Sequence, residues 1–276
     1  MCSRCGHALL AVLLVAAILF SGAACARPGQ AGLTLAGSTS IQPFVELLAE
    51  NFMASHPGRV VDVQGGGSSA GIQAALDGAA SIGMSSRDLK PGEEGLLEHC
   101  IAYDAIALIV NRQNPVTSLA LDQVRAIFSG QARDWSDVGG PPHRITVISR
   151  EEGSGTRSAF DDTVMGEVEV TPRALVQDSN GAIREVVAGD PWALGYMSLG
   201  LLDERVRAVA LDGVSPSVAS ALNREYRLVR PFLFLTRGAP AGLAREFIDY
   251  VLGPEGQLLL AGEGLVPVNP SEAAGR

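Results

Sequence analysis

Short apolar and β-branched runs alternate along this chain with longer stretches in which apolar residues recur every three or four positions. Residues 41–55 show the second pattern most clearly, because Ile41, Phe44, Leu48 and Phe52 fall on one stripe of a helix. We expect strands at residues 33–36, 59–64, 81–84, 101–111, 144–149, 193–198, 206–211 and 226–236. We expect helices at residues 41–55, 69–77, 121–128, 156–165, 180–188 and 241–260. Strands that alternate with helices predict an α/β fold with mostly parallel sheets.

Two of the expected strands, 101–111 and 226–236, are long and largely apolar. They are either central strands or connections between two lobes. The chain between them contains strand and helix alternation of its own. This pattern permits a discontinuous first lobe, residues 33–112 with 226–276, and an inserted second lobe, residues 113–225.

The composition supports a folded protein and excludes several classes. Hydrophobic residues make up 47% of the 276 positions and charged residues 18%, which is unlike a disordered or collagen-like chain. The formal net charge of −9 leaves no basic face for nucleic acid. After residue 25, no segment reaches the roughly 18 uninterrupted apolar residues that a membrane-spanning helix needs.

The N-terminal residues 1–25 have the pattern of an export signal. Arg4 supplies a positive charge, residues 8–20 are apolar, and the small residues 21–24 precede Cys25. This arrangement resembles a bacterial lipoprotein signal, in which the cysteine after the cut is lipidated. We expect an exported protein, in the periplasm or at the outer face of the cytoplasmic membrane, anchored at Cys25. The alternative is an ordinary cleaved signal.

The other cysteines fit this interpretation. Cys2 and Cys5 lie in the segment that would be removed. If Cys25 carries lipid, Cys100 is expected to be a small buried hydrophobe. If it does not, a disulfide between Cys25 and Cys100 is open in an oxidising compartment.

Polar turns rich in small residues follow four of the expected strands. They occupy residues 36–40, 65–71, 83–88 and 150–157. Each supplies hydroxyls and backbone N–H groups at or near a helix N-terminus, where the unpaired donors and the helix dipole favour an anion. Because ligands of α/β proteins bind beyond the carboxyl ends of the strands, we expect the four turns to form one anion site.

Three charged residues in these turns refine the prediction. The guanidinium groups of Arg87 and Arg150 match the geometry of an oxyanion. Glu152 would repel an anion unless that anion donates a proton to it. Phosphate carries such a proton near neutral pH and sulfate does not, so an acceptor-only carboxylate would select phosphate. The alternative is that Glu152 faces solvent.

With these turns, the chain resembles the phosphate-binding substrate-binding proteins of bacterial ABC phosphate importers, in the shorter branch of that family. The matching elements are residues 36–40, 65–71, 82–87, 150–157 and 195–200, with 128–130 followed by Trp135. The resemblance covers about residues 33–270. It implies a type II periplasmic-binding-protein fold, with a mixed sheet and flanking helices in each lobe and a hinge between the lobes.

The resemblance also implies which residues contact phosphate. One position departs from the longer branch, in which the third turn ends Ser-Asp and the aspartate takes the phosphate proton; here it reads Ser86-Arg87. We expect Arg87 to contact the anion or to form an ion pair between the lobes. The candidate phosphate-binding residues are Ser38, Thr39, Ser40, Ser68, Ser69, Ser86, Arg87, Arg150, Glu152, Ser154, Gly155 and Thr156.

Enzyme functions fit the sequence poorly. Residues 67–71 match a G-x-S-x-G nucleophile motif, but no histidine follows His143, and such a hydrolase needs one late in the chain. Lys90 precedes proline, which does not match a phosphate-binding P-loop. No cluster has metal-ligand spacing. We expect a binding protein without catalytic residues, cofactor or metal.

The expected function is high-affinity binding of inorganic phosphate outside the cytoplasm and its delivery, by closure of the lobes, to the permease subunits of an ABC importer. We expect a monomer. Two alternatives stay open: a phosphate sensor or scavenger, and a receptor for sulfate, molybdate or a phosphonate.

Overall fold

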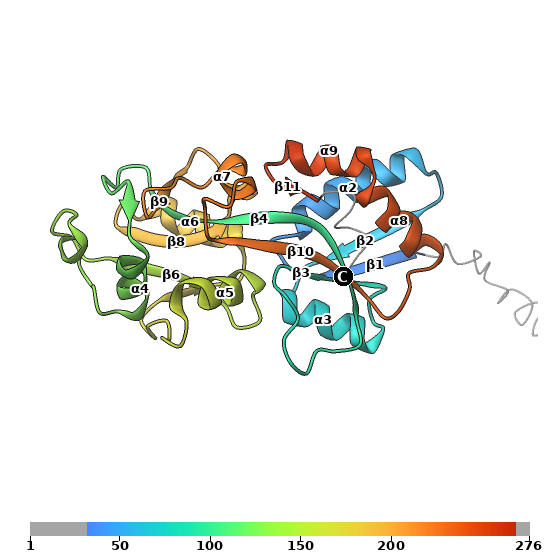
Figure 1. The fold of residues 1–276 in the computed structure, drawn as a ribbon, viewed down its shortest axis with the longest axis horizontal. Coiled ribbons are helices and arrows are strands. Elements are labelled where there is room, and N and C mark those ends of the chain that lie inside the picture. Colours follow the sequence, from blue (N-terminus) through green and yellow to red (C-terminus); the bar gives the residue numbers. More distant parts are fainter. Residues whose placement is uncertain (1–31, 269–276) are drawn as a thin grey trace, which may run out of the picture.

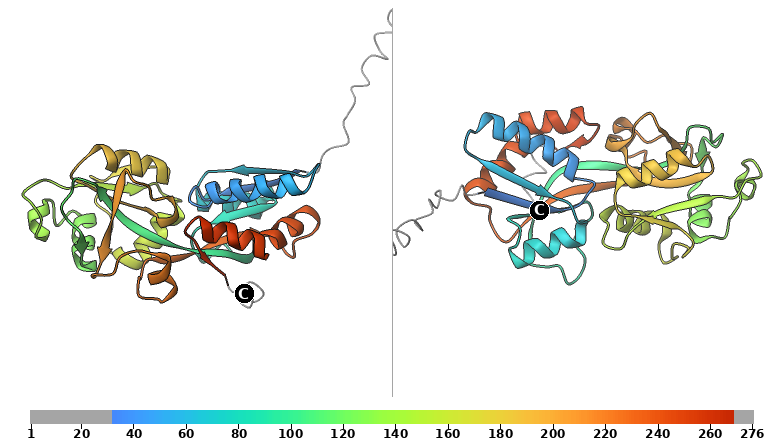
Figure 2. Two further views of the ribbon diagram at one scale, coloured as in Figure 1. Left: turned by 90° about the horizontal axis from the view of Figure 1, so that it is seen from above. Right: turned by 180° about the vertical axis from the view of Figure 1, so that it is seen from behind.

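A computed structural model describes residues 32–268 of the chain. Two lobes lie side by side along the long axis and are connected by two long strands, β4 and β10 (Figure 1). Both further views show the same separation (Figure 2). The expected signal at residues 1–25 and its Cys25 lie outside the described residues. Within 32–268, no helix is long and apolar enough to cross a membrane.

Lobe 1 is the lobe that contains the first strands of the described chain. Its sheet has the strand order β2-β1-β3-β10-β4, with β11 also paired to β4. Helix α3 covers one face, and α2, α8 and α9 lie on the other (Figure 1). The bounds are β1 (Gly32–Gly37), α2 (Gln42–Ser55), β2 (Val60–Gln64), α3 (Ser68–Asp77), β3 (Ile82–Ser85), β4 (Leu97–Asn111), β10 (Val229–Thr236), α8 (Gly242–Leu252), α9 (Pro254–Gly262) and β11 (Val266–Pro267).

Lobe 2 is formed by the chain between β4 and β10. Its sheet runs β4-β8-β6-β7, and β9 pairs with β4 and with β5. The strands are β5 (Ser118–Leu119), β6 (Thr146–Arg150), β7 (Leu175–Gln177), β8 (Ala193–Ser198) and β9 (Val206–Leu211). The helices are α4 (Leu121–Ser129), α5 (Gly155–Phe160), α6 (Asn180–Gly189) and α7 (Val218–Leu222), with short helical turns at Trp135–Val138, Asp161–Met165 and Leu199–Leu201.

Each lobe has a hydrophobic core of its own. Phe52 and Phe247 pack edge to face in lobe 1, with ring centroids 5.3 Å apart. In lobe 2, Phe128 and Phe160 pack 4.7 Å apart in the core that also contains the buried Trp135. Separate cores allow the lobes to move as units, because a relative movement leaves most of the apolar contacts intact.

The strand β4 belongs to both sheets. It pairs with β10 up to Ala105, which faces Val229, and with β8 from Ile106 onward. The change of partners therefore lies near the middle of β4, whereas the expected boundary at residues 112 and 113 lies at its end. One long strand serves both lobes, and sequence periodicity does not show where such a strand changes partners.

The expected elements recur in the structure with shifted bounds and three larger differences, and β5, β7, β11 and α7 were not expected. The expected helix 241–260 is two helices, because Gly253 and Pro254 interrupt it between α8 and α9. The expected helix 156–165 continues beyond α5 as a π-helical turn. The sheets are mixed, as the family resemblance implied, rather than mostly parallel as the alternation of elements predicted, since β4 and β10 run antiparallel to their neighbours.

Candidate anion-binding site

The expected turns meet where the two lobes face each other. Strands β1, β2 and β3 are parallel, and so are β6, β7 and β8. Parallel strands end at the same edge of a sheet, so the turns after β1, β2 and β3 lie together in lobe 1. The turn after β6 lies opposite them in lobe 2. Hydrogen bonds between Thr156 and Ser40 and between Arg150 and Thr39 join it to the first turn of lobe 1.

Buried hydroxyl groups from both lobes form the centre of this site. Ser38 Oγ donates to Ser86 Oγ at 2.9 Å, and the hydroxyls of Ser68 and Ser86 are 3.3 Å apart. Across the interface, the hydroxyls of Ser40 and Thr156 are 2.8 Å apart. We call these five residues the hydroxyl cluster. All five are buried, and every hydroxyl can act as donor or acceptor.

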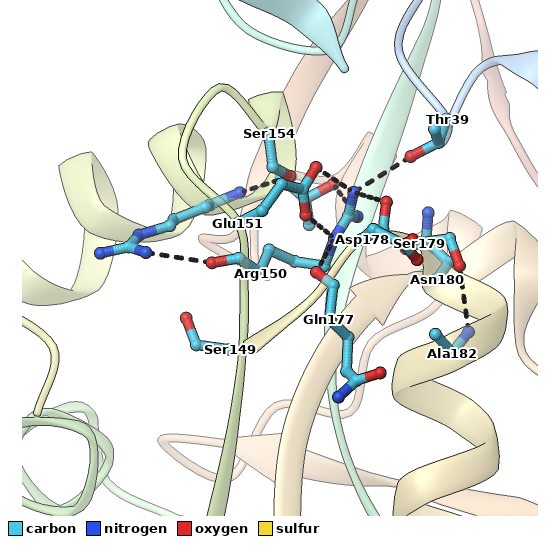
Figure 3. A network of polar contacts seen from close by, with 12 residues as sticks. Thr39, Ser149, Arg150, Glu151, Ser154, Gln177, Asp178, Ser179, Asn180 and Ala182 are labelled. Carbon is cyan, nitrogen blue, oxygen red and sulfur yellow. Dashed lines mark hydrogen bonds and ion pairs between the residues drawn. The ribbon is translucent and has the colours of Figure 1, made fainter. Parts of the chain in front are cut away.

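Arg150 ends β6 and connects lobe 2 to lobe 1 (Figure 3). Its side chain is only 1% exposed, and its Nε and Nη2 donate to the Glu151 carboxylate at 2.9 and 3.0 Å. Nη2 also donates to Thr39 Oγ1 at 3.0 Å and to the Asp178 carbonyl at 3.0 Å. Only Nη1 is directed toward the hydroxyl cluster, at 3.5 Å from Thr156 Oγ1.

Arg230 on β10 is a second arginine at the hydroxyl cluster. Its Nη1 donates to Thr156 Oγ1 at 2.7 Å and to Ser86 Oγ at 3.2 Å. Its Nε and Nη2 donate to Asp104 Oδ2 at 3.0 and 2.8 Å, and Ser198 Oγ donates to Asp104 Oδ1 at 2.8 Å. Burial raises the pKa of the Asp104 carboxyl, and the charge of Arg230 acts in the opposite direction.

Sequence reasoning missed Arg230 and Asp104, although a signal was present. Each is a charged residue inside a long, otherwise largely apolar strand. A charge at such a position is almost never fully buried unless it is paired. Each of the two expected strands therefore contributes one partner of a buried ion pair. The side chain of Arg230 is 1% exposed and that of Asp104 is 0% exposed.

The two arginines have the same arrangement. Each guanidinium binds a carboxylate through Nε and Nη2 and directs Nη1 toward Thr156. The carboxylates of Asp104 and Glu151 thus lie behind the arginines as seen from the hydroxyl cluster. Two positive N–H groups that converge among hydroxyls form a site for a tetrahedral oxyanion.

Two further residues support this arrangement and were also missed. Asn180, the first residue of α6, donates to Ser40 Oγ at 2.9 Å and accepts from the Ser198 amide at 3.0 Å. The Tyr196 hydroxyl lies 2.9 Å from Ser149 Oγ and accepts from the Arg150 amide at 3.3 Å. Burial raises the pKa of Tyr196 to about 12, so it stays neutral.

Close backbone approach brings the N-terminus of α5 against lobe 1. The Ser69 amide donates to the Gly153 carbonyl at 3.1 Å. A Cβ on Gly155 would overlap the hydroxyls of Ser68 and Ser86. Ser154 caps α5, because its Oγ accepts from the Arg157 amide at 3.3 Å. Position 155 therefore requires glycine, because any side chain there would collide with the turns of lobe 1.

The structure brings most of the expected site residues together. These are Ser38, Thr39, Ser40, Ser68, Ser86, Arg150, Ser154, Gly155 and Thr156.

It places the other three expected residues differently. Arg87 donates to both oxygens of Glu93 in its own lobe, at 2.8 and 2.7 Å, so it forms no ion pair between lobes. This pairing lowers the pKa of Glu93. Ser69 Oγ accepts from Arg87 at 3.2 Å. Glu152 is exposed, and within residues 32–268 its carboxylate has no hydrogen bond; its neighbour Glu151 holds Arg150 instead.

Cys100 is half-buried rather than buried, and its thiol donates to the Ala102 carbonyl at 3.5 Å. Within residues 32–268, no group of three or more histidine, cysteine, aspartate or glutamate side chains could hold a metal ion.

Two lobes on two hinge strands, with converging cations at their seam, define a binding protein that encloses a small anion. A model of the PBP superfamily domain matches residues 22–255. The phosphate-binding protein PstS of Bacillus subtilis is 30% identical over 94% of both chains. The chain belongs to the PBP superfamily and, within it, to the PstS family. This confirms the predicted resemblance, and the family is one of binding proteins rather than enzymes.

Solved structures agree with this assignment. A putative phosphate ABC transporter substrate-binding protein from Clostridium perfringens, with bound phosphate, is 40% identical over 86% of this chain and all of its own, with a TM-score of 0.84. An ABC-type phosphate transport receptor from Vibrio cholerae is 35% identical over the same share of this chain and all of its own, with a TM-score of 0.74. The predicted two-lobed type II fold is confirmed.

Proposed function

We propose that this protein binds one inorganic phosphate between its lobes. The observation that carries the proposal is the convergence of Nη1 of Arg150 and Nη1 of Arg230 on the Thr156 hydroxyl. The phosphate bound by the Clostridium perfringens relative, which is 40% identical, supports the same ligand.

The ligand would replace the hydrogen bonds that the hydroxyl cluster now makes within itself. Charged donors come from Arg150 and Arg230, and neutral donors from the hydroxyl cluster and Thr39. A micromolar dissociation constant corresponds to about −8 kcal/mol. Hydrogen bonds to charged groups contribute roughly 1.5–3 kcal/mol each, so these donors exceed the requirement and can offset desolvation and closure.

The net charge of −9 opposes the approach of an anion. Binding therefore depends on local donors rather than on the field of the whole protein. The two arginines are positioned by carboxylates that leave only Nη1 toward the hydroxyl cluster, so the orientation of each cation is set before the ligand arrives.

We further propose that closure on phosphate presents the protein, as a monomer, to the permease of an ABC importer. Lobe 1 contributes Ser40 and Arg230, and lobe 2 contributes Thr156 and Arg150. One anion would bind groups of both lobes and so favour the closed form, while β4 and β10 act as the hinge. The Clostridium perfringens substrate-binding protein and the Vibrio cholerae receptor, both named for ABC transport of phosphate, support this role.

The direct test is calorimetric titration of the protein with phosphate after bound anion has been removed. We expect a 1:1 complex with a dissociation constant in the micromolar range or below. A matched titration of Arg150→Met should show binding weakened by about 10- to 100-fold, because a charged hydrogen bond to the ligand is lost. A wild-type protein that shows no phosphate binding would refute the proposal.

We also propose export and lipid anchoring at Cys25, on the basis of the sequence pattern of residues 1–25. In a bacterial host, the wild-type protein should partition into detergent and carry a diacylglyceryl mass on its N-terminal peptide. Cys25→Ala should remain in the aqueous phase. Equal partitioning of both variants would instead indicate an ordinary cleaved signal.

A further inference from the structure

A second hollow of the molecule lies beside the two hinge strands, away from the hydroxyl cluster. It has a volume of about 740 Å³, which is in the range of sites for small organic molecules. We call it the hinge cavity; its lining includes Tyr103, Leu222, Arg224, Tyr226, Arg227 and Val266. We propose that the hinge cavity binds an aromatic organic anion and, resting on the proposed function, that this ligand favours the closed form and tightens phosphate binding.

The hinge cavity lies on the face of the β4 and β10 pair that points away from the hydroxyl cluster. Successive side chains of a strand point to opposite faces of a sheet. Asp104 on β4 pairs with Arg230 on β10, and Arg230 reaches Thr156. Their neighbours Tyr103 and Val229 therefore point to the other face, and both line the hinge cavity. The two strands separate the cavity from the anion-binding site.

Both lobes contribute walls to the hinge cavity. Val266 belongs to β11 of lobe 1 and Leu222 to α7 of lobe 2, and these two elements lie next to each other across the hinge (Figure 1). On the opposite face the lobes are closed, since the hydroxyls of Ser40 and Thr156 are 2.8 Å apart. A rotation that brings the lobes together on one face of the bending strands separates them on the other. The hinge cavity is therefore wider in the closed form than in the open form.

The charge of the lining favours an anion. The charged residues that line the hinge cavity are Arg224 and Arg227, and both are exposed. Arg224 follows the end of α7 with a φ of 59°, a backbone conformation that favours glycine. Non-glycine residues in this conformation occur preferentially at functional sites such as ligand clamps. On a protein with a net charge of −9, two cations at one cavity form a local site for a negative group.

The rest of the lining favours an aromatic body for this anion. The Tyr226 hydroxyl donates to the Ile106 carbonyl at 2.8 Å, so Tyr226 offers the cavity its ring. Tyr103 on β4 supplies a second ring, and Leu222 is 56% exposed at the cavity. Aromatic rings pack on one another in offset or edge-to-face arrangements, and guanidinium groups stack on aromatic faces. A compact aromatic carboxylate or sulfonate matches both the rings and the arginines.

The shape of the hinge couples this site to phosphate. A ligand that fits the wider cavity binds the closed form more tightly and shifts the lobes toward it. Phosphate favours the same form, because its site includes Arg230 of lobe 1 and Arg150 of lobe 2. Two ligands that favour one form strengthen each other by equal factors.

The test uses anilinonaphthalene sulfonate, an aromatic sulfonate whose fluorescence rises in apolar surroundings, as the probe. We expect 1:1 binding of the probe to the protein, with a dissociation constant at least about fivefold lower when phosphate is saturating. In the reverse titration, saturating probe should lower the phosphate dissociation constant by the same factor. Fluorescence measures the first effect and calorimetry the second.

Two variants test whether the probe occupies the hinge cavity. Leu222→Glu adds a carboxylate beside the two arginines and should weaken probe binding at least about tenfold, while phosphate affinity without the probe stays unchanged. Arg224→Gly should also weaken the probe by about tenfold without destabilising the fold, because glycine suits a φ of 59°. Leu258→Glu is the matched control: Leu258 on α9 is 75% exposed and lies outside the lining of the cavity.

The outcomes separate this inference from the proposed function. Probe binding that Leu222→Glu leaves unchanged, or that Leu258→Glu weakens equally, would overturn the assignment of the site. A probe affinity that phosphate leaves unchanged or lowers would overturn the coupling. A protein that binds the probe at the hinge cavity but binds no phosphate would refute the proposed function and the coupling with it, and would support the site for the aromatic anion.

Discussion

Replacing Arg230 with methionine should abolish phosphate binding at micromolar concentrations and also destabilise the fold. The variant removes the charged donor 2.7 Å from Thr156, and we expect the dissociation constant to rise by at least about 100-fold. It also leaves Asp104 buried without its partner. Breaking a buried ion pair in this way costs about 3–5 kcal/mol of unfolding free energy. Calorimetric titration and urea denaturation measure the two effects.

A double variant separates the two roles of this ion pair. In Asp104→Leu with Arg230→Met, both charges are replaced by apolar side chains, so the stability should largely return. Phosphate binding should remain lost, because the second cation is still absent. Arg245→Met is the control, since Arg245 is 69% exposed and pairs with Asp249 on its own helix, α8. Near wild-type affinity in the stable double variant would show that Arg230 has only a structural role.

Gly155→Ala should prevent closure of the lobes without harming the fold. A Cβ at this position would overlap the hydroxyls of Ser68 and Ser86, and it would lie 3.0 Å from the main-chain carbonyl carbon of Ser86. Main-chain atoms cannot move aside like the end of a long side chain. We expect phosphate binding to weaken by at least about 100-fold. The radius of gyration from small-angle X-ray scattering should stay at the value of the open, phosphate-free protein when phosphate is added.

The stability of this variant should not fall. Gly155 is the first residue of α5, and its φ lies outside the positive range that favours glycine, so alanine can adopt the same backbone conformation. The matched control is Gly189→Ala at the end of α6, where an added Cβ meets no atom within 4 Å; it should bind phosphate normally. Normal binding by Gly155→Ala would show that the lobes do not approach this closely when phosphate is bound.

The order of elements and the placement of the turns could be predicted from local sequence. Strands β1, β2, β3 and β6 have apolar or β-branched runs, and each is followed by a turn with glycine and hydroxyl residues. Those features act within a few residues of one another. Since the carboxyl ends of parallel strands share an edge, the sequence pattern was sufficient to place Ser40, Ser68 and Thr156 at one site.

Two features could not be predicted from local sequence because they depend on partners distant in the chain. Local pattern could not show that β4 changes partners at Ala105, because its apolar run continues through both lobes. Likewise, the choice between Glu151 and Glu152 depends on which of two adjacent carboxylates turns toward Arg150. Two adjacent glutamates look equivalent in the sequence, but in the folded chain Glu151 pairs with Arg150 and Glu152 is exposed.

The sequence by itself therefore determined the kind of fold, the family and the set of hydroxyl turns, since these rest on periodicity and on motifs of a few residues. The tertiary structure alone decided which charged side chains lie at the hydroxyl cluster. It paired Arg87 with Glu93 and brought Arg230, 74 residues beyond Thr156, to within 2.7 Å of its hydroxyl. Electrostatic roles depend on distances and burial that only the folded chain defines.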